Sequence, residues 1–460
     1  MHDAAPIGNA PGRIAVIGGG WSGWAAAVTL ADAGIPVTLF EQAKTMGGRA
    51  RRVMHDGIAV DNGQHLLVGA YRQTLELVAR VHGANGVAAP FHRLPLALRP
   101  LGTAQANAVR LSAWNAPAPL NLAGGILSAR GLRWTERRAV IAGFRRLARC
   151  GFRRPDDETV AQCFADTPRH AFNAIWAPLC LAALNTPPES ASARMFAQVL
   201  RAAFTGVARD SDFLVPAVDL SACFPEAAQR YVGNRGGTAR QGARVRAIAP
   251  SGANVAVDLG PAGTELFSAV IVAVGPHQLA ATIGAEGART EAWRAPLAQV
   301  GAFRYESITT IYVGFAGRLP FAVPLLRLDD APGQWIFDRT AALGSRVASG
   351  AESLVAVVIS AGGPHDALDH ATLAAQIEAQ LRRLEPGLPP VAWSRVFAER
   401  RATYACTPAL QRPASGRIAP GLYLAGDYTD AEFPATLEAA CRSGVAAARA
   451  LIVDRGARSR

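Results

Sequence analysis

The feature that most constrains the fold is the segment 13–41, which reads RIAVIGGGWSGWAAAVTLADAGIPVTLFE. A continuous apolar run precedes three glycines in the spacing GxGxxG (Gly18, Gly20 and Gly23), and an alanine-rich stretch then runs up to Gly34. Short apolar runs favour buried strands, and the alanine-rich stretch that stops at Gly34 favours a helix. The segment therefore predicts a strand, a tight turn, a helix and a second strand, which together form a βαβ unit.

The glycine turn of this unit suits a diphosphate. The first glycine allows the turn, the second lets the backbone approach the phosphates, and the third lets the helix pack closely on the strand. Free N–H groups and the positive end of the helix dipole also attract an anion. Glu41 closes the second strand 18 residues after Gly23, where a carboxylate accepts hydrogen bonds from ribose hydroxyls. The unit predicts a dinucleotide site that either NAD or FAD could fill.

The segment MGGRARR, directly after this unit, favours FAD over NAD. Gly47 and Gly48 let the backbone come close to a ligand. Arg49 carries a fixed fork of donors that can bind phosphate oxygens or the flavin itself. A plain nicotinamide dehydrogenase does not need such a segment, so we expect Gly48 and Arg49 to contact the cofactor.

A second segment, LAGDYTD, predicts the other end of the same cofactor site. It places Gly426 and Asp427 after a short apolar strand. A helix with regular apolar spacing, which includes Leu437, starts near Pro434 to Thr436. We expect Asp427 to accept hydrogen bonds from ribityl hydroxyls. We expect the helix start to face flavin N1 and the C2 carbonyl, where negative charge accumulates on reduction.

The order of these segments predicts a discontinuous nucleotide domain. The apolar strand AVIVAVGP at 269–276 reads as a return to the first sheet. We predict an α/β protein with a Rossmann-like FAD-binding domain and an inserted α+β substrate-binding domain. The FAD-binding domain comprises 1–90, 206–290 and 396–460, and the substrate-binding domain comprises 91–205 and 291–395.

Composition excludes several other classes of protein. Charged residues make up 18% of the chain and the formal charge of +12 is scattered, so we expect no nucleic-acid partner. The six cysteines show no CxxC pair and no metal-ligand spacing, so we expect no metal and a reducing, cytoplasmic setting. No run of about 18 apolar residues occurs, so we expect no membrane-spanning segment.

Taken together, several segments resemble the FAD-dependent amine oxidases and carotenoid desaturases. They are the N-terminal fingerprint, GGRA, DNGQH at 61–65, the adenosine-side strand near Val245, and the C-terminal LAGD. Within that superfamily the wording is most similar to the hydroxysqualene dehydroxylases of bacterial hopanoid synthesis. The matching stretches include DNGQHLLVGAYRQTLEL, LNTPPESASARMF, RATYACTP and AGDYTDAEFPATLEAACRSG, and they span nearly the whole chain.

The resemblance implies that reduced FAD delivers hydride to an allylic alcohol of roughly thirty carbons, that water leaves, and that squalene forms. It implies that the protein must exclude water and donate a proton or hydrogen bond to the leaving hydroxyl. Candidates for that polar role are His65, Tyr404, Asp427, Tyr428, Asp430 and Glu432. We take His65, Tyr404 and Asp430 as catalytic candidates, although a motif histidine in a turn often has a structural role.

Cys406 lies roughly where some amine oxidases carry a cysteine bonded to flavin, but its local wording CTP does not match theirs. We therefore expect a buried free thiol and noncovalent FAD. Desaturation or isomerisation of a carotenoid and oxidation of an amine are alternative activities of the same fold. A non-catalytic prenyl-binding escort protein is an alternative of another class, against which the intact glycines, Glu41 and Asp427 argue.

A C30 substrate also implies contact with a membrane, since so many apolar carbons do not stay free in water. We expect a peripheral contact, at the inner face of the membrane, because the chain carries no spanning segment. The candidate contact face comprises the apolar residues of 94–127, with Arg130 and Arg133 beyond them.

Overall fold

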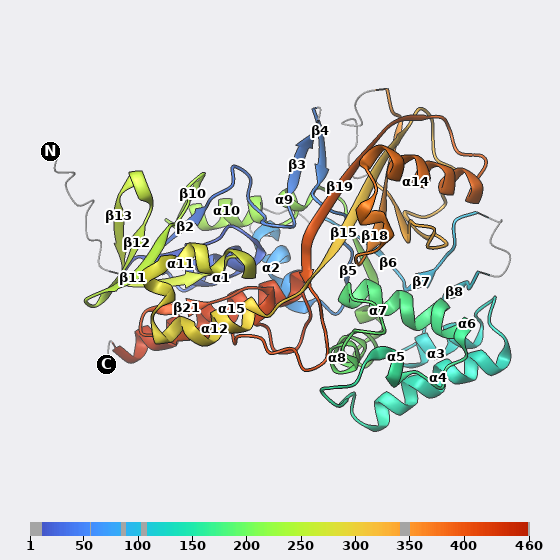
Figure 1. Ribbon diagram of the computed structural model, residues 1–460, viewed down its shortest axis with the longest axis horizontal. Helices are drawn as coiled ribbons and strands as arrows, with labels where there is room; N and C mark the ends of the chain where they lie inside the picture. The colour runs from blue at the N-terminus through green and yellow to red at the C-terminus, as the bar shows by residue number, and fades with distance from the viewer. Residues whose placement is uncertain (1–11, 56, 84–88, 103–107, 341–349, 459–460) are drawn as a thin grey trace.

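A six-stranded sheet forms the centre of the part of the protein that contains the glycine turn (Figure 1). The structure is a computed structural model that describes residues 12–55, 57–83, 89–102, 108–340 and 350–458. The strand order is β10 (Thr238–Gln241), β2 (Val37–Glu41), β1 (Ile14–Ile17), β14 (Ala269–Val272), β21 (Leu422–Leu424), β20 (Gly416–Ala419). All neighbours pair in parallel except β20 with β21. This sheet confirms the predicted Rossmann-like fold.

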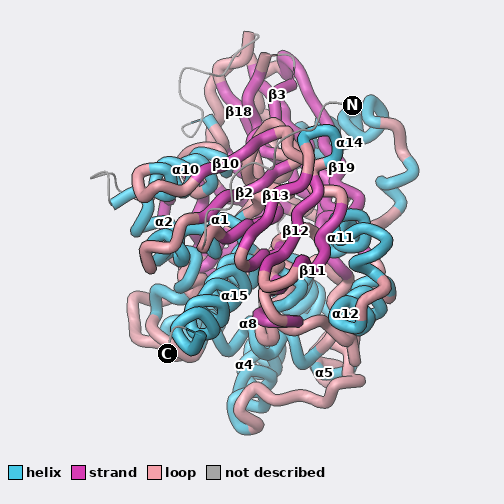
Figure 2. The backbone as a smooth tube through the Cα atoms, turned by 90° about the vertical axis from the view of Figure 1, so that its left-hand side faces the viewer, coloured by secondary structure: helices cyan, strands magenta, loops and turns pink. Residues whose placement is uncertain are grey.

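The side chains of β1 divide between two hydrophobic layers because successive residues of a strand point to opposite faces. Ile14 and Val16 pack with helices on one face, whereas Ala15 and Ile17 pack with elements on the other. The first face carries α1 (Trp21–Asp32), α2 (Arg72–Gly83), α9 (Leu220–Cys223), α10 (Pro225–Gly233) and α15 (Leu437–Arg458). The second carries β11 (Ala247–Ser251), β12 (Asn254–Asp258), β13 (Thr264–Phe267), α11 (Leu279–Ala288) and α12 (Glu291–Gly301). Figure 2 shows α11 and α12 beside the small sheet β11–β12–β13.

Small residues let α1 and α15 pack closely on each other. A Cβ at Gly444 would lie 2.1 Å from the carbonyl oxygen of Ser22, and the hydroxyls of Ser22 and Ser443 are 3.1 Å apart. Both helices follow strands of one parallel sheet, so both run back in the same direction. Because Gly444 lies seven residues after the start of α15, that start extends about 10 Å beyond the start of α1. Two helix N-termini are thus staggered along one direction.

The second part of the protein contains an antiparallel sheet and a group of helices. The sheet order is β16 (Leu325–Arg327), β17 (Trp335–Asp338), β18 (Ser353–Ser360), β15 (Tyr305–Phe315), β19 (Val391–Tyr404), with α14 (His370–Leu384) packed on it. The helices are α3 (Leu120–Leu127), α4 (Trp134–Arg149), α5 (Val160–Cys163), α6 (Arg169–Ala171), a π-helical turn (Phe172–Trp176), α7 (Ala177–Leu184) and α8 (Ala193–Phe204). Figure 1 places these helices at the end of the molecule away from β11–β13.

Short strands link the two parts. They are β3 (Arg52–His55), β4 (Ile58–Asp61), β5 (Leu67–Val68), β6 (Phe91–Leu94), β7 (Ala97–Leu98), β8 (Leu111–Ser112) and β9 (Phe213–Pro216). The helix α12 packs near α11 and β20, and β19 belongs to the antiparallel sheet as far as Tyr404. The predicted domain boundaries at 290 and 396 stay a prediction. Within the described part of the chain, no helix is long and apolar enough to cross a membrane.

Candidate functional site

The glycine turn between β1 and α1 leaves open room at a helix N-terminus. A Cβ at Gly18 would lie 2.6 Å from the carbonyl oxygen of Ala273, and one at Gly23 would lie 1.9 Å from the carbonyl oxygen of Gly18. Packing within the protein therefore explains these two glycines. At Gly20 only the Cα of Gly48 comes within 4 Å, at 3.9 Å. No side chain caps α1, so the free space and the uncapped N–H groups fit a bound diphosphate.

Glu41 is held rigidly at the end of β2 beside this turn. It is 9% exposed, and its two carboxylate oxygens accept hydrogen bonds from the N–H groups of Gly19 and Ala43, each at 2.7 Å. A carboxylate has roughly four acceptor positions, so two remain for ribose hydroxyls. The N–H group of Gly242 donates a hydrogen bond to the carbonyl of Ala43. Ala43 therefore lies beside the segment that leads to Val245, a buried residue.

The MGGRARR segment lies directly against the glycine turn. Gly47 N–H donates to the Gly19 carbonyl at 2.8 Å, and Gly48 has φ +63°, a conformation that favours glycine. Arg49 then reaches the C-terminal segment, where Nη2 lies 2.6 Å from Asp427 Oδ2. Its Nη1 donates to the Ala402 carbonyl at 2.6 Å. Arg49 and Asp427, which the sequence placed in separate segments, form an ion pair.

The LAGDYTD loop is held by a hydrogen bond to α15. Gly426 has φ +146°, and its N–H donates to Ser443 Oγ at 3.0 Å. Thr436 caps α15, because its hydroxyl accepts the N–H of Ala439 at 3.1 Å, and Leu437 begins the helix. Asp427 is 7% exposed. Hydrogen bonds and an ion pair therefore connect the glycine turn, the MGGRARR segment and the LAGDYTD loop.

Burial favours the neutral form of His65, and a hydrogen bond fixes which ring nitrogen carries the hydrogen. Its Nδ1 lies 2.8 Å from the Gly63 carbonyl, which can only accept, so Nδ1 carries the hydrogen. Burial lowers the pKa of His65, although the Gly63 carbonyl opposes the shift. The remaining nitrogen, Nε2, is therefore an acceptor. These contacts favour a positioning role for His65.

Tyr404 and Asp430 have different surroundings. Tyr404 is 1% exposed and its hydroxyl accepts a hydrogen bond from Arg412 at 2.7 Å, so its own proton remains available. Asp430 accepts from the N–H groups of Glu432 and Phe433 at 2.9 and 2.7 Å and pairs with Arg442 at 2.9 Å. These contacts stabilise its own loop. The catalytic role of Asp430 stays a prediction.

The aromatic rings of Tyr404 and Tyr428 both lie beside the ring of Phe303. The Phe303 centroid lies 5.2 Å from that of Tyr404 and 6.4 Å from that of Tyr428. Tyr428 is fully buried, and its hydroxyl has no hydrogen-bond partner among the described residues. Burial raises the pKa of Tyr428, so the phenol stays protonated. An unpaired buried hydroxyl costs free energy unless a ligand satisfies it.

Asn185 was absent from the predicted site and proves to be a junction between its elements. Its amide nitrogen donates to the Ser307 carbonyl at 3.2 Å and to Thr403 Oγ1 at 3.0 Å. Its amide oxygen accepts the Ala361 N–H at 2.7 Å. The next residue, Thr186, accepts the N–H of Cys406 at 3.0 Å. Only the sequence motif LNTPPES drew attention to this segment, and the motif did not indicate a role for Asn185.

A buried ion pair ties the DNGQH segment to the antiparallel sheet. Asp61 and Arg339 are each 2% exposed, and Asp61 Oδ2 lies 3.4 Å from Arg339 Nη2. Asp61 Oδ1 also accepts the Leu220 N–H at 2.7 Å. Burial raises the pKa of Asp61 to about 7, despite the opposing effect of Arg339.

Asp61→Asn should change how stability depends on pH. A carboxyl whose folded pKa is raised contributes stability that is present below its ordinary pKa and is lost as pH rises through about 7. The wild type should therefore lose stability relative to Asp61→Asn between pH 5 and pH 8, as urea unfolding at each pH would measure. A constant difference in stability between the wild type and the variant over this range would show instead that Arg339 keeps the pKa of Asp61 low.

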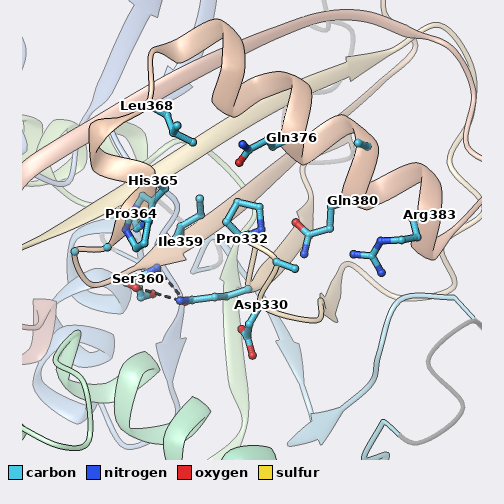
Figure 3. A pocket seen from close by; sticks show the side chains of 15 residues that line it. Asp330, Pro332, Ile359, Ser360, Pro364, His365, Leu368, Gln376, Gln380 and Arg383 are labelled. Atoms are coloured by element: carbon cyan, nitrogen blue, oxygen red, sulfur yellow. Dashed lines mark hydrogen bonds between the residues drawn. The ribbon is translucent and has the colours of Figure 1, made fainter.

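A cavity of about 810 Å³ lies elsewhere, between α14 and β18 (Figure 3). Gln380 and Arg383 line it from α14, and Ile359 and Ser360 line it from β18. None of the predicted flavin-binding residues contributes to its wall. This cavity is separate from the candidate site. The described residues contain no group of three or more His, Cys, Asp or Glu side chains arranged to bind a metal.

Comparison with known proteins supports the resemblance. The chain matches the family described as flavin containing amine oxidoreductase over residues 21–452. It is 28% identical to the hydroxysqualene dehydroxylase of Rhodopseudomonas palustris, over 95% of this chain and 97% of that protein. It is 27% identical to that of Sinorhizobium fredii, over 95% of this chain and 98% of that protein.

Solved structures agree on the fold. An oxidoreductase from Methanosarcina mazei superposes with a TM-score of 0.67 at 16% identity, covering 96% of this chain and all of that one. A double mutant of putrescine oxidase superposes with a TM-score of 0.68 at 15% identity, covering 96% and 99%. At these identities the likeness shows the fold alone.

Proposed function

Because the chain belongs to the flavin containing amine oxidoreductase family and uses FAD, we propose that it converts hydroxysqualene to squalene by reductive dehydroxylation, in hopanoid or related triterpenoid synthesis. The observation that carries this proposal is the similarity to hydroxysqualene dehydroxylases of two organisms over 95% of the chain. The family assignment, with the intact glycine turn, disfavours the non-catalytic escort alternative.

We assign the cofactor contacts as follows. Gly20 leaves room for the diphosphate at the start of α1, in the turn that Gly18 and Gly23 allow to form. Glu41 accepts hydrogen bonds from the ribose of the adenosine, near Val245. Gly48, Arg49, Gly426 and Asp427 hold the middle of the cofactor, while the start of α15 at Thr436 and Leu437 faces its reacting end. Bound in its reduced form, FAD supplies the hydride that replaces the hydroxyl of the substrate. The stagger of about 10 Å between the helix starts supports this order.

Tyr404 is our candidate for the group that assists the leaving hydroxyl. Its oxygen accepts from Arg412, so its own proton is free to be donated. Burial raises the pKa of Tyr404 well above its ordinary value, so its phenol stays protonated and donates a hydrogen bond to the substrate hydroxyl. The proton is transferred when that hydroxyl leaves as water. His65, neutral and accepting at Nε2, positions rather than protonates. Phe303 and Tyr428 line the same region with apolar ring faces that suit a carbocation-like state.

Product analysis tests this proposal against its alternatives. The purified enzyme, reduced without oxygen, should convert hydroxysqualene in detergent micelles to squalene, which chromatography identifies. A carotenoid desaturase would instead act on a polyene with its flavin oxidised, and an amine oxidase would release peroxide from an amine in air. Either of these products, without squalene, would replace the proposal.

We predict that FAD is bound noncovalently. Cys406 is fully buried, and burial raises the pKa of its thiol to about 12, which disfavours the thiolate needed for attachment. Acid precipitation should therefore release all of the flavin into the supernatant. Yellow colour that stays with the protein pellet would contradict this.

The proposed substrate also implies a membrane contact. Each buried methylene contributes about 0.8 kcal/mol to transfer out of water, so a C30 alcohol partitions into lipid. We propose that the protein collects its substrate from a bilayer as a peripheral protein on the inner face. Part of the candidate contact segment, residues 103–107, lies outside the described residues.

A further inference from the structure

The helix α3 presents an apolar stripe to solvent. Leu120, Gly124 and Leu127 are spaced i, i+4 and i+7, so they share one helix face. Leu120 is 63% exposed and Leu127 is 37% exposed. Leu120 and Leu127 are thus not buried against the described part of the protein, whereas Gly124 between them is buried.

The ring of an exposed tryptophan packs directly on Gly124. A Cβ at Gly124 would lie 2.2 Å from the indole of Trp114, so only glycine lets the ring lie on the helix. The indole N–H donates to Ser128 Oγ at 3.0 Å, and the Ser128 hydroxyl donates to the Gly124 carbonyl at 2.8 Å. Trp114 is nevertheless 53% exposed. The ring is therefore fixed in orientation while much of its surface remains in water.

Arginines surround this stripe, and few acidic side chains lie close enough to neutralise their charge. Trp134, at the start of α4, is 58% exposed, and Arg137 joins α4 to α3 by donating to the Leu127 carbonyl at 2.6 Å. The spacing of α4 places Arg138, Arg145 and Arg149 on one exposed face. Among the described residues no ion pair involves these three or Arg130. The one acid within α4, Glu136, is 1% exposed and pairs with Arg133 and His170.

We propose that this surface, the α3–α4 face, docks on an anionic lipid bilayer. It comprises Trp114, Leu120, Leu127 and Trp134 with Arg130, Arg133, Arg138, Arg145 and Arg149. Tryptophan and leucine enter the interface between headgroups and acyl chains, while arginines bind anionic headgroups. A symmetric pairing of two copies would instead set one arginine cluster against another. The inference rests on the proposed function, because a C30 substrate gives the protein a reason to bind lipid.

The position of the face within the protein fits this role. Behind it, the buried side of α4 at Val140 and Leu147 belongs to one hydrophobic cluster that also includes Tyr404 and Tyr428. Apolar packing is therefore continuous from the docking face to the candidate catalytic residues. Figure 1 shows α3 and α4 at the end away from β11–β13, so the nucleotide-binding part would point away from the lipid.

Vesicle flotation of the holoenzyme tests the docking face. Wild type should float with vesicles that contain phosphatidylglycerol and much less with pure phosphatidylcholine. The variant Leu120→Ser/Trp134→Ser/Arg145→Glu should lose at least ten-fold in the bound-to-free ratio. A control variant, Leu266→Ser/Val453→Ser, changes residues that are 37% and 70% exposed in the nucleotide-binding part and should float like wild type.

Activity and oligomeric state separate the possible failures. In detergent micelles the docking variant should keep its flavin and its turnover, since none of its substitutions touches the candidate site. Wild type that fails to float, or a docking variant that floats as well as wild type, would overturn the α3–α4 face. A change from dimer to monomer in the variant, with flotation unchanged, would assign the face to a second copy instead. Failure of micellar dehydroxylation alongside normal flotation would count against the proposed function only.

Discussion

Asn185→Ala should lower the free energy of unfolding by about 2 to 5 kcal/mol. Two separate costs add. The Ala361 N–H loses its buried acceptor at 2.7 Å, which costs about 1 to 3 kcal/mol. Asn185 also sits at φ 47°, a left-handed conformation that asparagine tolerates and alanine adopts at a cost of about 1 to 2 kcal/mol. The unfolding midpoint in urea measures the sum.

Asn185→Gly separates these two costs. Glycine adopts the left-handed conformation without steric cost but supplies no amide, so it should lose about 1 to 3 kcal/mol. A matched control is Asp156→Asn, which removes an ion pair between Asp156 and Arg194. Because the Asp156 side chain is 71% exposed, its loss should change stability by less than about 1 kcal/mol. An alanine variant as stable as wild type would show that the Asn185 junction contributes little.

Glu41→Ala should weaken FAD binding by roughly ten- to more than a hundred-fold. The variant loses a charge-assisted contact to the ribose, which contributes about 1.5 to 3 kcal/mol. It also frees the N–H groups of Gly19 and Ala43 that the carboxylate accepts at 2.7 Å. We therefore expect purified variant with little flavin and a measurable loss of stability. Titration of the apoprotein with FAD gives the dissociation constant.

The control for this prediction is Glu76→Ala. Glu76 is 55% exposed at its side chain and pairs with Arg80 on the surface of α2, so its loss should leave flavin content unchanged. If Glu41→Ala were purified with the same flavin content as wild type, Glu41 would not be the ribose ligand.

The nucleotide fold could be predicted from sequence because its signals are local. Strand, glycine turn and helix follow one another within residues 14–32, and both the turn geometry and the close packing depend on glycines at fixed spacing. The start of α15 was predicted for the same reason, since Thr436 caps the helix that Leu437 begins. Sequence alone also indicated the cofactor through two such local segments.

The contacts that assemble the site could not be predicted because they join distant segments. Arg49 and Asp427 are 378 residues apart, and Asp61 and Arg339 are 278 apart. No periodicity relates such pairs, so only the folded chain reveals them. Asn185 is a similar case, because its role comes from meeting β15, β18 and β19 at one point. The roles of His65 and Asp430 also depend on hydrogen bonds that the sequence does not specify.

The direction of electron flow is the central claim, and one measurement tests it most directly. Hydroxysqualene added to the reduced enzyme without oxygen should restore the oxidised flavin spectrum and yield squalene in an equal molar amount, while polyene hydrocarbons should not bleach the oxidised enzyme. Hydride addition with loss of water consumes reduced flavin, whereas desaturation produces it. Bleaching of the oxidised enzyme by a polyene precursor, with no response of the reduced enzyme to the alcohol, would contradict the account in favour of a desaturase.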